Sequence, residues 1–148
     1  MPARVGEAAH ILRLQATMQS SSPQTLALVL RLSAILFLIA WFGAIMPSTW
    51  MEYFHRLSNT GSWSDTPFFE YLARCTSALF GFYGVMTWYL SKDVERYLPL
   101  IRFLAWSGLP MAVILTYIGY VAGLPAWWYG TEGFAVILIR LIWIKASQ

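Results

Sequence analysis

Four long apolar runs follow one another along the chain and are separated by short polar segments. They cover residues 26–46, 67–90, 98–121 and 127–144. Each run has about 18 to 24 residues, which is the length that an α-helix needs to cross a hydrocarbon core about 30 Å thick. The pattern therefore predicts four transmembrane helices.

The segments between the last three runs are short. Only residues 123–126 connect the third run to the fourth, so successive helices must lie side by side and antiparallel. The simplest architecture is an all-α polytopic membrane protein, an antiparallel four-transmembrane-helix bundle. On this interpretation residues 1–25 are an N-terminal tail, residues 26–145 are the transmembrane domain, and residues 146–148 are a C-terminal tail.

The longer segment between the first two runs has a pattern of its own. Its apolar residues recur at helical spacing, and Ser48 or Thr49 followed by Glu52 has the form of a capping box. These apolar positions are Trp50, Tyr53, Phe54 and Leu57. We expect a short amphipathic helix that lies in the plane of the outer headgroups.

Composition supports lipid as the solvent. Apolar residues make up 58% of the chain and charged residues 11%, about half the charged fraction of an ordinary soluble domain. The net charge of +3 does not indicate nucleic-acid binding, because the basic residues form no dense patch. Cys75 is the single cysteine, and His10 and His55 are isolated, so no metal or other cofactor is expected.

Lys and Arg are distributed unevenly between the two ends of the predicted helices. One side holds Arg4, Arg13, Arg31, Lys92, Arg96, Arg102, Arg140 and Lys145, and the other holds Arg56 and Arg74. The positive-inside rule then places both termini in the cytoplasm. Three arginines within the runs, Arg31, Arg102 and Arg140, stand near the cytoplasmic ends, and we expect them to extend to the headgroups.

The second run carries a stripe of polar and small residues on one helical face. The stripe consists of Glu70, Arg74, Ser77, Gly81, Gly84 and Trp88. Small residues allow a neighbouring helix to approach closely, so this face is predicted to point into the bundle. Gly119 and Gly123 offer a similar packing site in the third run.

Arg74 is the charge that most needs a partner. It lies about 10 Å below the outer end of its helix, Glu70 stands four residues before it in the favourable order for an ion pair, and Glu132 enters the fourth run from the same side. We therefore predict a cluster of Glu70, Arg74 and Glu132. The simplest role for it is a buried ion pair that specifies packing.

A functional role for the cluster is also open. It would form the polar end of an outward-facing pocket for a lipid or a quinone-like headgroup. Aromatic residues near the outer ends would form the walls: Tyr71, Tyr117, Tyr120, Trp127 and Trp128. Catalysis by Glu70 or Glu132 is the least favoured role, because no histidine lies within the runs to act as a base.

Three short stretches resemble a known kind of protein. Residues 70–74, 93–100 and 123–128, together with Glu132 and Gly133, are similar to an uncharacterised group of small bacterial four-helix membrane proteins. More distantly they resemble the DoxX-like superfamily and the small sterol-scaffold proteins. The resemblance implies a four-helix bundle that works beside another membrane protein, and it transfers no active site, because only Glu70 and Glu132 match the acidic lining of the related sterol isomerases.

These observations give three functional hypotheses in order of preference. The first is a non-catalytic accessory or scaffold subunit that packs against a larger membrane protein complex in a bacterial inner membrane. The second is a binder of a lipid, quinone or isoprenoid-like molecule near Arg74. The third is a small membrane enzyme that acts on a lipid-soluble substrate.

Overall fold

The computed structural model describes residues 23–59 and 66–147, and this part of the chain is entirely helical. The helices are an N-terminal helix over 23–39, α2 (Trp41–Ile45), α3 (Ser48–Leu57), α4 (Pro67–Leu90), α5 (Val94–Val121) and α6 (Ala126–Ala146). They coincide closely with the apolar runs of the sequence. The predicted N-terminal tail lies almost wholly outside the described residues.

Local chemistry fixes where the long helices start. α4 begins with Pro67, which suits the first helical position because the N–H that proline lacks would have no partner there. α5 begins at Val94 rather than at residue 98, because the Asp93 side chain accepts a hydrogen bond from the Arg96 backbone N–H at 3.2 Å. This cap satisfies one of the free donors of the first turn.

Two helical segments are long and apolar enough to cross a membrane. They are Pro23–Ile45, which joins the N-terminal helix to α2 across a turn at Ala40, and Val94–Val121. α4 and α6 have 24 and 21 residues, which is also sufficient length. Charged, aromatic and glycine residues make α4 and α6 less apolar than the two segments named above.

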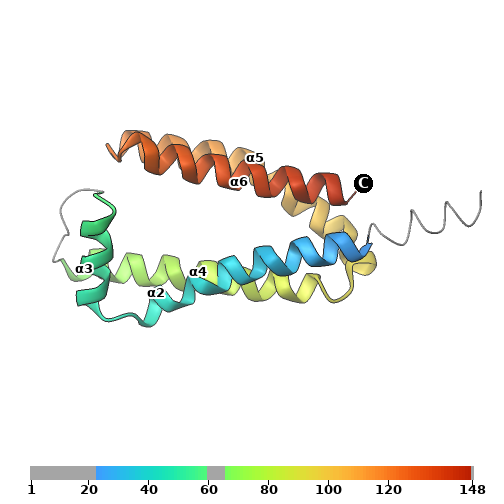
Figure 1. Cartoon of the computed structure of the whole chain (residues 1–148), viewed down its shortest axis with the longest axis horizontal. Helices are drawn as coiled ribbons and strands as arrows, with labels where there is room; N and C mark the ends of the chain where they lie inside the picture. The colour runs from blue at the N-terminus through green and yellow to red at the C-terminus, as the bar shows by residue number, and fades with distance from the viewer. Residues whose placement is uncertain (1–22, 60–65, 148) are drawn as a thin grey trace, which may run out of the picture.

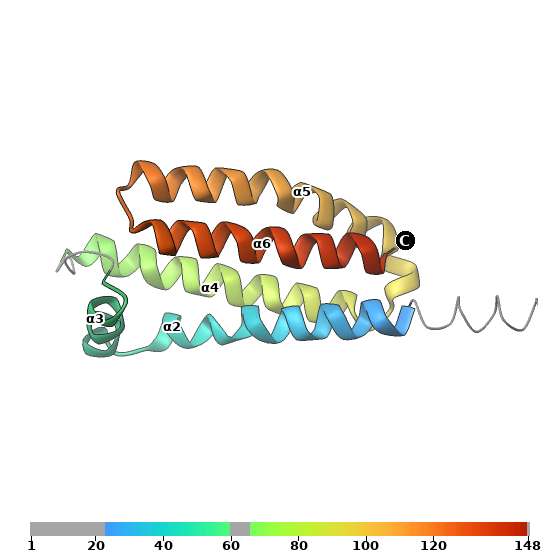
Figure 2. The same cartoon turned by 45° about the horizontal axis from the view of Figure 1, so that its top comes forward.

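The long helices are arranged as two hairpins (Figure 1). The first hairpin consists of residues 23–45 and α4, and the second consists of α5 and α6. They lie close together where the N-terminal helix starts and α6 ends, which we call the closed end. They diverge toward the other end, where α3 crosses the first hairpin, and we call this the open end (Figure 1). Figure 2 shows α3 at the same end of the helices.

The buried core lies at the closed end. It consists of Leu26, Leu30, Leu90, Val94, Ile101, Ala105 and Trp143. Trp143 of α6 is fully buried, and its Nε1 donates a hydrogen bond to Ser33 Oγ of the N-terminal helix at 3.0 Å. These contacts join the two hairpins to each other.

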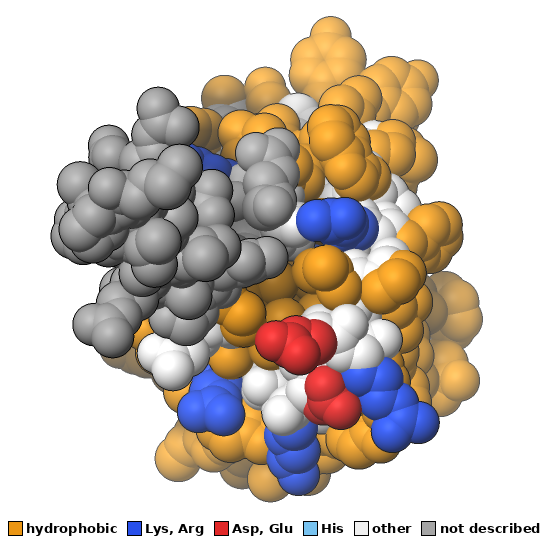
Figure 3. Space-filling model, turned by 90° about the vertical axis from the view of Figure 1, so that its right-hand side faces the viewer, with side chains coloured by type: hydrophobic (Ala, Val, Ile, Leu, Met, Phe, Trp, Pro, Cys, Tyr) orange, Lys and Arg blue, Asp and Glu red, His pale blue; other side chains and the backbone are white. Residues whose placement is uncertain are grey.

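The closed end also carries most of the exposed charge. Lys92, Asp93, Glu95 and Arg96 between α4 and α5 are exposed, as is Lys145 at the end of α6. Figure 3 looks at this end and shows basic side chains around the acidic ones. This is the side that the distribution of Lys and Arg assigns to the cytoplasm.

Glycines in α4 allow the first hairpin to pack tightly. A Cβ on Gly81 would lie 1.9 Å from Cδ1 of Trp41, and a Cβ on Gly84 would lie 2.8 Å from the backbone N of Leu38. The predicted small-residue face is therefore confirmed at these two positions, where it packs against residues 23–45. Trp88, at the end of the predicted stripe, stays exposed.

The turn between α5 and α6 separates the roles of two glycines that the sequence suggested as one packing site. Gly119 is a packing position, because a Cβ there would lie 2.6 Å from Cβ of Tyr129. Gly123 faces open space with φ of +72°. Leu124 N–H donates to the Gly119 carbonyl and Gly123 N–H to the Tyr120 carbonyl, the two bonds of a Schellman motif. A packing role for Gly123 is therefore wrong.

Replacing Gly123 by alanine is expected to destabilise the second hairpin by about 1 kcal/mol, because a Cβ is strained at positive φ. Thermal unfolding in mild detergent measures the effect. Gly130→Ala is the matched control, since its added Cβ meets no atom within 4 Å. Equal melting temperatures for both variants would show that the turn does not need the left-handed conformation.

α3 forms where the amphipathic pattern predicts it, but the predicted capping box is absent. The residue before the helix is Pro47, and no side chain caps the first turn. The Ser48 hydroxyl donates instead to Glu70 Oε1 of α4 at 2.7 Å, and Glu52 pairs with Arg56. The start of α3 is thus held by α4 rather than by its own side chains.

Candidate functional site

Arg74 sits in a complete hydrogen-bond network at the open end of the first hairpin. Its Nη2 lies 2.6 Å and its Nε 2.9 Å from Glu70 Oε1, and its Nη1 donates to the Ala44 carbonyl at 3.0 Å. Ala44 stands in the last turn of α2, where carbonyls have no partner within the helix. The predicted Glu70–Arg74 ion pair is present, and it fastens α4 to α2.

The prediction that Glu132 is the third member of this cluster is wrong. Glu132 lies on α6 in the other hairpin and forms neither an ion pair nor a hydrogen bond with any residue that the structure describes. Ser48 takes its place, since its Oγ lies within 3.4 Å of Arg74 Nη2 as well as close to Glu70. The two hairpins diverge at this end, which separates α6 from Arg74 (Figure 1).

The predicted aromatic walls do not gather around Arg74. All five side chains are exposed, and no hydrogen bond or ring contact joins any of them to Arg74: Tyr71, Tyr117, Tyr120, Trp127 and Trp128. Trp127 and Trp128 contact each other, with ring centroids 5.5 Å apart. The region around Arg74 is a packing lock in which each of the three guanidinium nitrogens donates a hydrogen bond.

Replacing Arg74 by methionine is expected to lower the stability of the first hairpin by about 2 kcal/mol, the contribution of hydrogen bonds to a charged group. Unfolding in mixed detergent and dodecyl sulfate measures the loss. Arg56→Met is the matched control, because the Arg56–Glu52 pair is exposed on α3 and is expected to contribute about 0.5 kcal/mol or less. Similar losses in both variants would contradict the lock.

Arg102, which was expected to extend to the headgroups, is exposed and also caps α6. Its Nε donates to the Ser147 carbonyl at 3.0 Å, and its Nη2 bonds the same oxygen. A cation at the C-terminal end of a helix also interacts favourably with the helix dipole. Arg102 therefore fastens the start of α5 to the end of α6.

Arg140 contradicts the expectation from sequence most strongly. Only 9% of the residue is exposed, and its Nε and Nη1 are buried without a hydrogen-bond partner. The side chain lies against bare backbone of α5, since a Cβ on Gly108 would come within 2.2 Å of Arg140 Nε. The guanidinium is thus held between helices and does not extend to the headgroups.

Three helices surround the Arg140 guanidinium. Its Cζ lies 4.7 Å from the ring centroid of Trp143 on α6 and 5.6 Å from that of Tyr83 on α4, and Gly108 belongs to α5. The aromatic faces attract the cation, by about 2 kcal/mol when it is desolvated. They offer no lone pair along the N–H directions, so the donors stay unsatisfied.

Arg140 lies next to the buried core of the closed end. It stands six residues before the end of α6, about 9 Å along the helix axis. Trp143 of the core follows about one turn further along α6. The Arg140 Nη2 makes no hydrogen bond to any described residue and is not among the fully buried donors.

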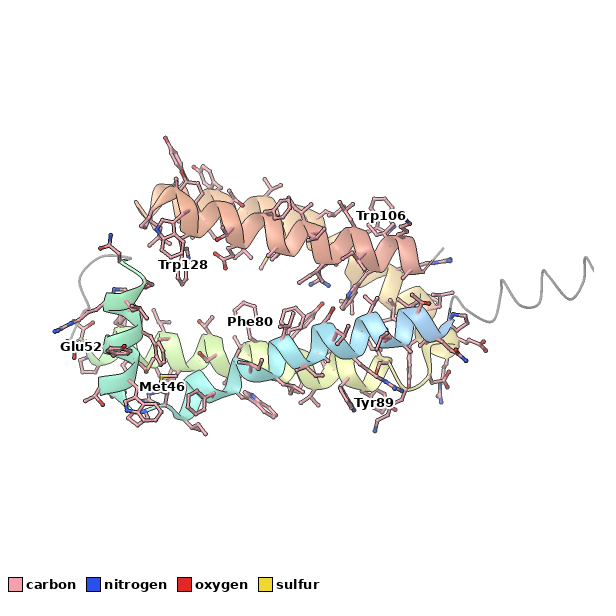
Figure 4. The ribbon with its side chains drawn as sticks, in the orientation of Figure 1. Met46, Glu52, Phe80, Tyr89, Trp106 and Trp128 are labelled. Carbon is pink, nitrogen blue, oxygen red and sulfur yellow. The ribbon has the colours of Figure 1, made fainter. Side chains whose placement is uncertain are left out.

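Aromatic side chains line the space beyond Arg140. Figure 4 shows Phe80 of α4 and Trp128 of α6 pointing from opposite hairpins into the region between them, whereas Trp106 and Tyr89 point away from it. Phe80 is 41% exposed and Trp128 is 38% exposed, so the two facing surfaces do not fill the region with protein. On the first hairpin, Phe37 packs against both Phe80 and Tyr83.

Comparison with known proteins found no match. No family model, no curated protein and no solved structure matches the chain. The similarity to small bacterial four-helix membrane proteins therefore rests on the quoted residues alone. The candidate site is Arg140 with Gly108, Tyr83 and Trp143. One indication of it can be read from the sequence: the nearest acidic residue on the same helix, Glu132, is about 12 Å from Arg140 along the axis.

Proposed function

We propose that this protein spans a bacterial inner membrane four times, with both termini cytoplasmic, and binds a lipid-soluble molecule between its two hairpins without transforming it. Two helices already have the length and apolarity of a span. Large apolar side chains are exposed on α4 and α6 as well, among them Phe82, Val85, Phe134 and Leu138. Hydrocarbon is the solvent in which such surfaces are stable.

The observation that carries the binding proposal is the unsatisfied guanidinium of Arg140. A buried donor without an acceptor costs about 1–3 kcal/mol, and more when it is charged. Arg140 has two such nitrogens, and its third, Nη2, is not among the fully buried donors. The aromatic side chains that lead to it supply apolar walls, the usual composition of a site for a small molecule.

Catalysis finds less support. Glu70 is occupied by Arg74 and Ser48, and Glu132 makes no hydrogen bond or ion pair with any described residue. A proton-transfer enzyme needs a donor and an acceptor poised near its substrate. Binding needs only the cation and the apolar walls.

An accessory subunit is the second candidate, and one observation favours it. Phe80 and Trp128 leave apolar surface on both hairpins at the open end, where a transmembrane helix of another protein would find two walls. The small-molecule proposal ranks first because the unpaired guanidinium of Arg140 needs a polar or charged partner, which the apolar face of a transmembrane helix does not supply.

Photo-crosslinking tests the two candidates together. A photoreactive amino acid is placed at Phe80 or Trp128 in cells, and at Trp106 or Tyr89 as controls that point away from the region. We expect one small-molecule adduct of defined mass at positions 80 and 128, and unselective phospholipid adducts at 106 and 89. A defined protein adduct at 80 and 128 would favour the accessory subunit, and identical adducts at all four positions would refute both.

A further inference from the structure

We infer that the molecule held between the hairpins is a long-chain carboxylic acid whose carboxylate pairs with the guanidinium of Arg140. This inference rests on the proposed function and names its ligand class. The ligand would direct its carboxylate toward Arg140, and its alkyl chain would lie along Phe80, Trp128 and the other apolar surfaces that face each other toward the open end.

The first step is the charge of Arg140. The ion pairs among the described residues are Arg74–Glu70 and Arg56–Glu52, and neither includes Arg140. A buried cation without a counter-anion is costly in a low-dielectric interior, and the aromatic rings of Tyr83 and Trp143 offset only part of that cost. The site is therefore complementary to a negative charge.

The second step is the position of Arg140 along the helices. Trp143, which contacts the guanidinium, belongs to the buried core of the closed end, so we expect a ligand to approach from the hydrocarbon side. A phospholipid would have to withdraw its permanently charged phosphate from the headgroup layer. A carboxylic acid crosses hydrocarbon in its protonated, neutral form and then binds as the anion.

The third step concerns the surroundings of the Arg140 guanidinium and their polarity. Tyr83, Gly108 and Trp143 lie around the guanidinium on three helices, and a carboxylate is among the smallest headgroups that carry a full negative charge. A quinone or ketone carbonyl would accept a hydrogen bond there but would leave the positive charge uncompensated. Charge-assisted hydrogen bonds from arginine to carboxylate are about twice as strong as neutral ones.

The test uses the full-length wild-type protein, purified, delipidated and placed in nanodiscs of phosphatidylcholine. Native mass spectrometry measures the binding of hexadecanoic acid, its methyl ester and hexadecanol, which have equal chain length. We expect one hexadecanoate per chain, bound at least tenfold more tightly than the ester or the alcohol. Equal binding of the three probes would overturn the carboxylate assignment.

Variants locate the site. Arg140→Gln is expected to remove the preference for the acid over the ester, and Gly108→Ala to weaken it, because the new Cβ displaces the guanidinium while its charge remains. Arg56→Gln, on the exposed face of α3, is the matched control and should bind as the wild type does. If Arg140→Gln does not fold, the comparison of probes on the wild type still decides. A preference for the acid that persists in a folded Arg140→Gln variant would overturn the site.

The remaining outcomes separate this inference from the proposed function. Displacement of hexadecanoate by phosphatidylglycerol at equal concentration would assign the site to a lipid phosphate and overturn the carboxylic acid. A small-molecule crosslink at positions 80 and 128 without a preference for the acid would leave the proposed function standing and refute only the headgroup. A protein adduct at positions 80 and 128, in place of a small molecule, would overturn both the carboxylic acid as ligand and the proposed small-molecule binding.

Discussion

Replacing Trp143 by alanine is expected to destabilise the protein by about 3 kcal/mol, at the lower end of the range for removing a buried tryptophan. Trp143 has no exposed surface and joins the two hairpins. Lipid is as apolar as the lost contacts, so most of the transfer free energy of a soluble core is absent. The loss of packing and of the hydrogen bond to Ser33 remains. Reversible unfolding in mixed micelles measures the difference.

Two comparisons separate the contributions. Ser33→Ala removes the hydroxyl that accepts from Trp143 Nε1, and we expect it to cost about 0.6 kcal/mol, the mean for such bonds in a bilayer. Trp106→Ala on α5 is the matched control, because that side chain is 59% exposed and points away from the bundle. Equal losses for Trp143→Ala and Trp106→Ala would show that the hairpins do not meet at the closed end.

Replacing Gly84 by valine is expected to cost about 3 kcal/mol, the upper part of the range for overpacking. A Cβ on Gly84 would lie 2.8 Å from the backbone N of Leu38 and 3.0 Å from the carbonyl of Ala34. Backbone atoms of a helix cannot move aside as a flexible side chain does, so α4 must separate from the N-terminal helix. Unfolding in mixed micelles again gives the magnitude.

Gly130→Val is the matched control for Gly84→Val. Both residues lie within long helices, but a Cβ on Gly130 meets no atom within 4 Å. We expect Gly130→Val to be neutral or slightly stabilising, because valine has a better helix propensity than glycine. If both variants unfold alike, the close approach of α4 to the N-terminal helix is not what holds the first hairpin together.

The helices were accessible from the sequence because their signal is local. Apolar runs of sufficient length, Pro67 at a helix start and the glycine after α5 are read within a few residues of each other. The Glu70–Arg74 pair was predictable for the same reason, since residues four apart on a helix are neighbours. The short helix α3 also followed from its own periodicity.

The packing of helices against each other was not accessible in the same way. Ser48 and the Ala44 carbonyl replace Glu132 beside Arg74 because residues 23–45 lie against α4, while α6 belongs to the other hairpin. A helical wheel shows which residues share a face, but it does not say which helix covers that face. The small-residue stripe of α4 was therefore correct as a face and undetermined in its partner.

Arg140 shows the same limit for a single side chain. An arginine six residues from a helix end has the reach to extend to the headgroups. What prevents this is Gly108 on another helix, which leaves space for the guanidinium beside the α5 backbone. No pattern within either helix links Gly108 to Arg140, and the contact depends on how α5 and α6 cross.

The measurement that tests the central claim most directly is the environment of spin labels at Phe80 and Trp128, in delipidated protein in nanodiscs, with Cys75 replaced by serine. If the hairpins diverge beyond Arg140, both labels should be mobile and as accessible to dissolved oxygen as a label at exposed Phe82 of α4. Immobile labels shielded from oxygen at both positions would mean that α4 and α6 pack along their whole length, and this would contradict a binding region between the hairpins.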